Sequence, residues 1–289
     1  MTNTGRQKPA DAWAIALFAG GLSIGSVHAG LAKGLSAELP VLMIAWGRYL
    51  AFLITISSIS FTIYGISTIR PTRPILQWVR GIAFVTSATC TIAALQGLPL
   101  ADTIAILFVY PFVATALSPW LLKERLQAAH WISITVGFIG VLVVMRPSVD
   151  GVSIHALLAL CSGLAFGIQL VVTRQLSGSS HPVVTATYTA AIGTIVLSCI
   201  IPWAWTPLNT SQLQTLGLIG IIAAAGQFMV IKACDRADAS ALAPFGYLEI
   251  IGAAFVGLLM FSDWPDQLTF TGIGIIIFSG VYMATATRR

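Results

Sequence analysis

The sequence predicts an all-α membrane protein with ten transmembrane helices, arranged as two inverted five-helix repeats around a central cavity. Three observations lead to this prediction: apolar blocks of membrane-spanning length, an uneven distribution of Lys and Arg, and a weak internal repeat. Hydrophobic residues make up 57% of the 289 residues and charged residues only 9%. Soluble domains are about 25% charged, so a water-facing surface could not be covered, and a bilayer is the expected environment.

The apolar blocks recur from end to end, each close to the ~20 residues that cross a bilayer as a helix. They are residues 12–33, 39–64, 75–96, 101–122, 129–146, 152–174, 182–203, 213–234, 239–261 and 267–287. The connections between them are short and leave no room for a soluble domain. The chain is therefore predicted to be a multi-pass protein.

The basic residues predict the orientation of these helices. With the N-terminus inside, twelve of the 15 Lys and Arg fall on the cytoplasmic side: Arg6, Lys8, Arg70, Arg73, Arg80, Lys123, Arg125, Arg174, Lys232, Arg236, Arg288 and Arg289. Only Lys33 and Arg146 fall outside, and Arg48 lies within the second helix. Because cytoplasmic loops are enriched in basic residues, both termini are predicted to face the cytoplasm.

A weak repeat relates the two halves of the chain. At a shift of 142 residues, Gly21, Leu22, Gly25 and Pro40 align with Gly163, Leu164, Gly167 and Pro182. At a shift of 137, Thr103, Phe108 and Tyr110 align with Ser240, Phe245 and Tyr247. Each repeat holds five helices, residues 1–148 and 149–289, within one structural domain. Since five is odd, the second repeat must enter the membrane from the opposite side, a design common in secondary transporters.

One motif suggests an enzyme instead. Residues 21–25 read Gly-x-Ser-x-Gly, the turn that presents a nucleophilic serine in many hydrolases, and His28 follows. That motif needs a preceding strand, and here it lies inside an apolar block. Ser23 aligns with Ala165, while the flanking glycines persist, so the repeat keeps only Gly-x-x-x-Gly, a close-packing motif of membrane helices. We expect no enzyme; an intramembrane enzyme using Ser23 and His28 is the alternative.

Residues 94–126, ALQGLPLADTIAILFVYPFVATALSPWLLKERL, carry a family resemblance. The Leu-Pro-Leu-Ala link, the mid-span Pro111 and the Glu124–Arg125 pair resemble the drug/metabolite transporter superfamily, in particular its ten-helix EamA-type exporters. The overall pattern is most similar to bacterial exporters of amino acids, including aromatic ones. The resemblance implies a bacterial inner-membrane location, a central cavity between helices 1, 3, 4, 6, 8 and 9, and outward movement of a small metabolite.

The polar residues within the apolar blocks are few and are the candidate lining of that cavity. They are His28, Thr89, Tyr110, Gln169, Gln227, Tyr247 and Glu249. Tyr110 and Tyr247 are pseudo-symmetric partners that could flank an amphipathic ligand with rings and hydroxyls. The alternative is that these side chains only join helices by hydrogen bonds. His28 is interpreted either as such an interhelical donor or as a titrating switch.

Two charged residues have several possible roles. Glu249 lies near mid-membrane, where a carboxyl could couple export to protons, bind a substrate amine, or stay protonated against a backbone carbonyl. Arg48 cannot lose its charge and needs a partner; it anchors the fold or binds a substrate carboxylate. Pro111 and Pro244 interrupt the fourth and ninth helices, freeing the carbonyls of Leu107 and Ser240, and serve as hinges or as simple kinks.

The sequence thus predicts a secondary transporter that exports small amphipathic metabolites, amino acids above all, by alternating access. A proton-coupled exporter of drugs or organic cations that uses Glu249 is the alternative, and a channel is a third hypothesis. No Gly-x-x-x-x-Gly-Lys-Ser/Thr motif for ATP is present. We expect no cofactor and no metal. The expected partners are a small-molecule substrate and the lipid bilayer, with no nucleic acid, and the chain is expected to be a monomer.

Overall fold

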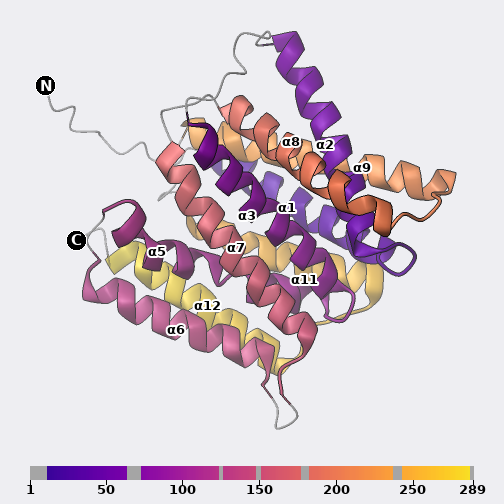
Figure 1. Ribbon diagram of the computed structural model, residues 1–289. Coiled ribbons are helices and arrows are strands. Elements are labelled where there is room, and N and C mark those ends of the chain that lie inside the picture. The colour runs from indigo at the N-terminus through magenta and orange to yellow at the C-terminus, as the bar shows by residue number, and fades with distance from the viewer. Residues whose placement is uncertain are drawn as a thin grey trace, which may run out of the picture.

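The computed structural model describes residues 12–63, 73–123, 126–147, 151–176, 182–236 and 243–286, and their regular secondary structure is helical (Figure 1). The first half contains α1 (Ala12–Leu35), α2 (Val41–Ile63), α3 (Pro74–Leu95), α4 (Leu100–Leu107), α5 (Tyr110–Leu121) and α6 (Ala128–Met145). The second half contains α7 (Ile154–Leu176), α8 (Pro182–Ile200), η2 (Ile201–Trp203), α9 (Thr210–Arg236), η3 (Ala243–Tyr247), α11 (Leu248–Phe261) and α12 (Gln267–Ala286). The predicted all-α class is confirmed.

The described helices account for the predicted apolar blocks. Eight stretches are long and apolar enough to cross a membrane, and two shorter apolar stretches, Phe245–Phe261 and Gln267–Met283, correspond to the ninth and tenth blocks. The fourth and ninth spans, which the sequence predicts to be interrupted at Pro111 and Pro244, are each built from two segments. The boundary between the two predicted repeats falls within residues 148–150, outside the described ranges.

The fourth span is broken next to its proline. Helix α4 ends at Leu107, and α5 begins at Tyr110 with Pro111 as its second residue. Since proline has no N–H, the Leu107 carbonyl loses the donor it would have one turn later. The ninth span contains a related break, where the short 3₁₀ segment η3, which includes Pro244, leads into α11. Ser240, whose carbonyl was predicted to be freed there, lies outside the described residues.

The helices pack in pairs that join the two halves of the chain. Helix α1 packs against α9 and α11, and α2 also packs against α9. In a matching arrangement, α7 packs against α3 and the α4–α5 segments, and α8 packs against α3. Helices α2 and α8 contact each other, as do α6 and α12, which lie side by side in Figure 1. Every one of these pairs takes one helix from each half, so neither half forms a separate bundle.

Glycines allow the closest helix contacts. A Cβ placed on Gly21 would lie 2.9 Å from the carbonyl oxygen of Gly226, so α1 and α9 meet backbone to backbone. Gly140 of α6 and Gly272 of α12 meet in the same way. Ser23 is exposed, and its hydroxyl donates to the Ala19 carbonyl one turn back (2.9 Å). The Gly-x-Ser-x-Gly stretch is therefore a helix surface, without the strand and turn that a catalytic serine requires.

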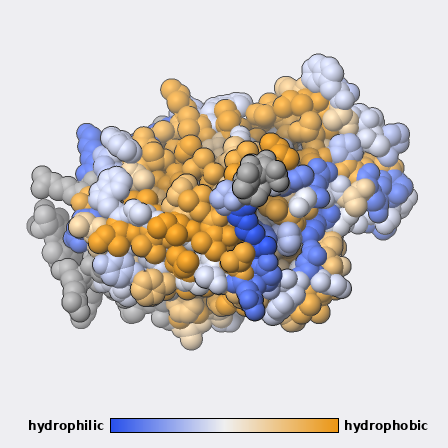
Figure 2. Space-filling view, turned by 90° about the horizontal axis from the view of Figure 1, so that it is seen from below, coloured by the Kyte–Doolittle hydropathy of each residue, from blue (hydrophilic) through white to orange (hydrophobic). Residues whose placement is uncertain are grey.

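The outer surface is strongly apolar. Large hydrophobic side chains such as Phe278, Leu259 and Phe255 are exposed on α12 and α11. Figure 2 shows apolar residues covering a broad part of the face seen from below, with a hydrophilic band near the middle and further hydrophilic residues at both ends. Contiguous apolar patches of this kind are rare on soluble monomers, and here they fit contact with lipid.

The α1–α9 contact can be tested by filling it. The Gly21→Ala variant places a methyl group against the Gly226 carbonyl, which is backbone and cannot rotate away. We expect a loss of about 1–3 kcal/mol of stability, seen as a lower melting temperature of the detergent-purified protein. Gly217→Ala on α9 is the matched control, because a Cβ there meets nothing within 4 Å. Equal melting temperatures for both variants would contradict this packing.

Candidate functional site

The two broken spans bring aromatic residues into the interior. Six rings follow one another from η3 through the α4–α5 break to α7, α3 and α2, and we call them the aromatic chain. Its centroid separations are Tyr247–Phe108 5.3 Å, Phe108–Tyr110 5.2 Å, Tyr110–Phe166 4.8 Å, Phe166–Phe84 6.1 Å and Phe84–Tyr49 6.3 Å. These separations are those of favourable aromatic pairs, so the chain forms a continuous aromatic wall with a tyrosine at each end, Tyr247 and Tyr49, and Tyr110 between them.

The two predicted tyrosine partners both contact Phe108, but they point differently. The Tyr110 hydroxyl faces η3, 4.0 Å from the position of a Cβ on Gly246. The Tyr247 hydroxyl instead lies against Gly280 of α12. The structure therefore joins their rings in one wall and separates their hydroxyls.

Glu249 lies in the first turn of α11, directly beside α1. Its Oε1 is 3.8 Å from the position of a Cβ on Gly25, so the carboxyl lies in van der Waals contact with this turn of α1. Its backbone carbonyl accepts a hydrogen bond from the Ser26 hydroxyl (3.1 Å). Among the described residues no hydrogen bond or ion pair reaches the carboxyl, and Tyr110 lies within its electrostatic range. A hydrogen bond from a protonated Glu249 to a backbone carbonyl, one of the predicted alternatives, is not present among the described residues.

His28 and Arg48 lie near this group, one on α1 and one on α2. The His28 Nδ1 is 3.1 Å from the Gly25 carbonyl oxygen, one turn back, and its Nε2 is buried without a hydrogen-bond partner in the described part of the chain. Arg48 is 8% exposed and lies within electrostatic range of His28. Its guanidinium stands 5.3 Å from the Tyr49 ring, and its Nε also lacks a partner within the described ranges. Buried polar atoms are normally paired, so this concentration of unpaired ones marks a site.

The remaining predicted lining residues are less tightly connected. The Thr89 hydroxyl on α3 is buried and unpaired among the residues described. Gln169 is buried on the face of α7 that carries Phe166 and Thr173, three and four residues away. Gln227 follows Gly226 on α9 and is half-buried, and no described contact joins its side chain to the cluster of Glu249, His28 and Arg48.

Arg80 is a buried charged residue that the sequence prediction missed. It was assigned to the cytoplasmic charges, but the structure buries it inside α3 at 6% exposure. Its guanidinium donates to the Thr173 hydroxyl of α7 (2.7 Å) and to the Thr185 carbonyl (3.3 Å) and Thr189 hydroxyl of α8. No carboxylate pairs with it among the residues described. Its position as the sixth residue of the apolar block 75–96 was the one sequence signal that could have indicated burial.

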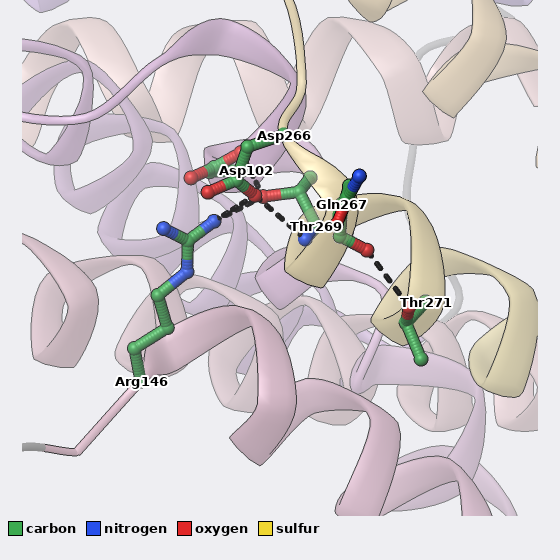
Figure 3. A network of polar contacts seen from close by, with 6 residues as sticks. All are labelled: Asp102, Arg146, Asp266, Gln267, Thr269 and Thr271. Carbon is green, nitrogen blue, oxygen red and sulfur yellow. Dashed lines mark hydrogen bonds and ion pairs between the residues drawn. The ribbon is translucent and has the colours of Figure 1, made fainter.

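A second polar network lies apart from this interior cluster, at the ends of three helices (Figure 3). Arg146, at the end of α6, pairs with Asp266, and also donates to the Thr269 hydroxyl (2.8 Å). The Thr269 hydroxyl in turn donates to Asp102 of α4 (3.0 Å). Nearby, Lys33 of α1 pairs with Asp263 at 2.6 Å. These contacts bind the ends of α1, α4, α6 and α12 together on the side predicted to be external.

Asp266 also caps α12. Its Oδ1 accepts a hydrogen bond from the Thr269 backbone N–H (2.9 Å), as an N-cap residue does. This hydrogen bond, with a further contribution from Arg146, lowers the pKa of the Asp266 carboxyl below its usual range. The carboxylate is therefore charged at all but acidic pH, and so is its pair with Arg146.

The Asp266 charge should contribute to stability in a pH-dependent way. Asn can also cap a helix, so Asp266→Asn removes the charge and retains the cap; we expect a lower melting temperature at pH 7. A lowered pKa means that the stabilisation is complete above the ordinary Asp pKa of about 3.9 and is lost as pH falls through the lower value. The difference from the parent should stay constant from about pH 7 to 5 and shrink below about pH 4. A difference that shrinks already at pH 6 would contradict this role.

The interior cluster has the chemistry of binding rather than catalysis. It presents donors on Arg48, acceptors on Glu249, and an aromatic wall, inside a membrane bundle. In the described part of the chain, no three His, Cys, Asp or Glu residues come together as a metal site would need. Ser23 and His28 lack the arrangement of a nucleophile and its base, since the Ser23 hydroxyl is committed to the Ala19 carbonyl.

Comparison with known proteins agrees with a transport role. A sequence profile of the EamA-like transporter family matches residues 11–146 and residues 153–285. The S-adenosylmethionine uptake transporter of Rickettsia bellii is 25% identical over 263 residues, covering 90% of this chain and 89% of that protein. The pseudopaline exporter of Pseudomonas aeruginosa is 28% identical over 275 residues, covering 91% and 93%. The riboflavin transporter of Rhizobium johnstonii is 24% identical over 226 residues, covering 78% and 75%.

A solved crystal structure has the same fold, with a TM-score of 0.64 and 20% sequence identity over 96% of this chain and 99% of that one. The relatives are transporters rather than enzymes. Their names include both an uptake transporter and an exporter, and three different cargoes.

Proposed function

The chain belongs to the EamA-like transporter family, and we propose that it is an inner-membrane secondary transporter that exports small amphipathic metabolites, above all amino acids including aromatic ones. The observation that carries this proposal is the interior cluster of Arg48, Glu249 and His28 beside the aromatic chain. Such a site offers an apolar surface and charges of both signs. That is the combination a small amphipathic metabolite with a charged head group requires.

The buried charges favour a carboxylate-bearing cargo over a simple organic cation. Arg48 is buried and keeps its charge, and its Nε has no partner among the described residues. A charged group inside a bilayer is costly without a partner, and a substrate carboxylate would supply one. An organic cation would leave Arg48 unpaired.

We propose alternating access as the mechanism, with the cavity between two inverted repeats of five helices, residues 1–148 and 149–289. Two observations support this. The family profile matches the chain twice, once in each half. The helix contacts of the two halves also correspond: α1 packs against α9 and α11, and its counterpart α7 packs against α3 and the α4–α5 segments. In this proposal the breaks at Pro111 and Pro244 act as hinges, and both termini are cytoplasmic.

Counterflow in liposomes tests the proposed function. Purified protein is reconstituted into liposomes loaded with unlabelled L-phenylalanine, and uptake of labelled L-phenylalanine is measured with a panel of amino acids, riboflavin and organic cations as competitors. We expect saturable uptake that other amino acids reduce and organic cations do not. Uptake without saturation or counterflow would indicate a channel. Counterflow reduced by organic cations would favour the drug exporter.

A further inference from the structure

The hydrogen bond of His28 determines which of its ring nitrogens carries the proton. Its Nδ1 lies 3.1 Å from the Gly25 carbonyl oxygen, and a carbonyl oxygen only accepts. Nδ1 is therefore the donor, and the neutral ring presents Nε2 as an acceptor. Nε2 is buried and has no partner in the part of the chain that the structure describes. The site thus contains a buried acceptor that needs a donor.

A second acceptor lies beside the same turn of α1. The Glu249 carboxyl is next to Gly25, with Oε1 3.8 Å from the position of a Cβ there. Gly25 and His28 are three residues apart, so they share one face of the helix. No described residue donates to this carboxyl or forms an ion pair with it. Glu249 and His28 Nε2 together form an acceptor pole.

Arg48 supplies the opposite pole. A guanidinium can only donate, and the buried Nε of Arg48 is unpaired among the described residues. Arg48 lies within electrostatic range of His28, so the donor pole adjoins the acceptor pole. It forms no ion pair with Glu249. Neither charged group has a partner among the described residues, so each is available to a ligand.

We propose that this cluster recognises the zwitterionic head group of an α-amino acid in a fixed orientation. The ammonium donates to the Glu249 carboxylate and to His28 Nε2, and the carboxylate accepts from the Arg48 guanidinium. An apolar side chain then meets the aromatic chain at Tyr110, which lies within electrostatic range of Glu249. This inference rests on the proposed transport function and adds to it a binding polarity, with Glu249 and Arg48 as the residues that determine specificity.

The orientation predicts how analogues of one substrate rank. L-Phenylalanine fills both poles, phenethylamine leaves Arg48 unpaired, and 3-phenylpropionate leaves Glu249 and His28 unpaired. Hydrogen bonds to charged groups contribute enough that losing one pole should weaken binding by about 10- to 100-fold. In the counterflow assay we therefore expect L-phenylalanine to compete at least tenfold better than either analogue.

Variants of the two poles should each remove the preference for L-phenylalanine, relative to a different analogue. Glu249→Gln keeps the shape of the side chain and should weaken L-phenylalanine by at least tenfold while leaving 3-phenylpropionate unchanged. Arg48→Gln should weaken the binding of L-phenylalanine and leave that of phenethylamine unchanged. Arg48→Lys, which keeps the positive charge, should restore part of the L-phenylalanine binding that Arg48→Gln loses. The matched controls are Glu38→Gln and Arg174→Gln, which change the same residue types at exposed positions. Melting temperatures establish that each variant is folded.

Some outcomes overturn the orientation without affecting the proposed function. If Glu249→Gln weakens all three compounds equally, or if 3-phenylpropionate competes as well as L-phenylalanine in the parent, Glu249 does not bind the ammonium. If Arg48→Gln does not fold, the Glu249→Gln comparison alone decides. If liposomes loaded with riboflavin take up labelled riboflavin by counterflow while L-phenylalanine shows none, the amino-acid head group is the wrong ligand while transport stands. The absence of counterflow with every compound would refute transport itself.

Discussion

The cost of placing a charge inside a bilayer constrains the whole interior of this protein. Arg48 and Arg80 cannot shed their protons, so each must be solvated by protein or ligand. The structure solves this in two ways. Arg80 is surrounded by threonine hydroxyls and a carbonyl from α7 and α8, whereas Arg48 keeps an unpaired buried nitrogen beside His28. Arg80 is thus paired within the fold, whereas the Nε of Arg48 has no partner among the described residues, and this difference is the basis for proposing Arg48 as a ligand contact.

The backbone geometry of two helix segments shapes the candidate site. The α4–α5 break next to Pro111 brings Phe108 and Tyr110 into one aromatic wall. On the facing side Gly25 has no side chain, and Glu249 occupies the space beside it. Irregular backbone inside a membrane is tolerated only where protein or a water-filled cavity surrounds it, which is why these features coincide with the candidate site.

The membrane class and the helix boundaries follow from the sequence, because apolar length and charge are local properties. The predicted blocks 12–33 and 75–96 differ from α1 and α3 by only one or two residues at each end. The partners of buried polar groups could not be predicted. That Arg80 meets Thr173 and Thr189 depends on the register between α3, α7 and α8, and two of those contacts join residues about a hundred positions apart. Likewise, the Tyr110 and Tyr247 hydroxyls point to different neighbours, Gly246 and Gly280. This difference depends on the conformation of η3, which the sequence repeat does not predict.

Two related helix contacts, α3 with α7 and α8, and α1 with α9, are held together by different interactions. In the repeat alignment at a shift of 137 residues, Arg80 of α3 aligns with Gly217 of α9. Because glycine has no side chain, the hydrogen bonds by which Arg80 joins α3 to α7 and α8 have no counterpart where α9 packs against α1. That seam rests on Gly21 and Gly226. The α3 seam can therefore open only if Arg80 gives up several hydrogen bonds at once, whereas the α1–α9 seam depends on the close approach of two backbones.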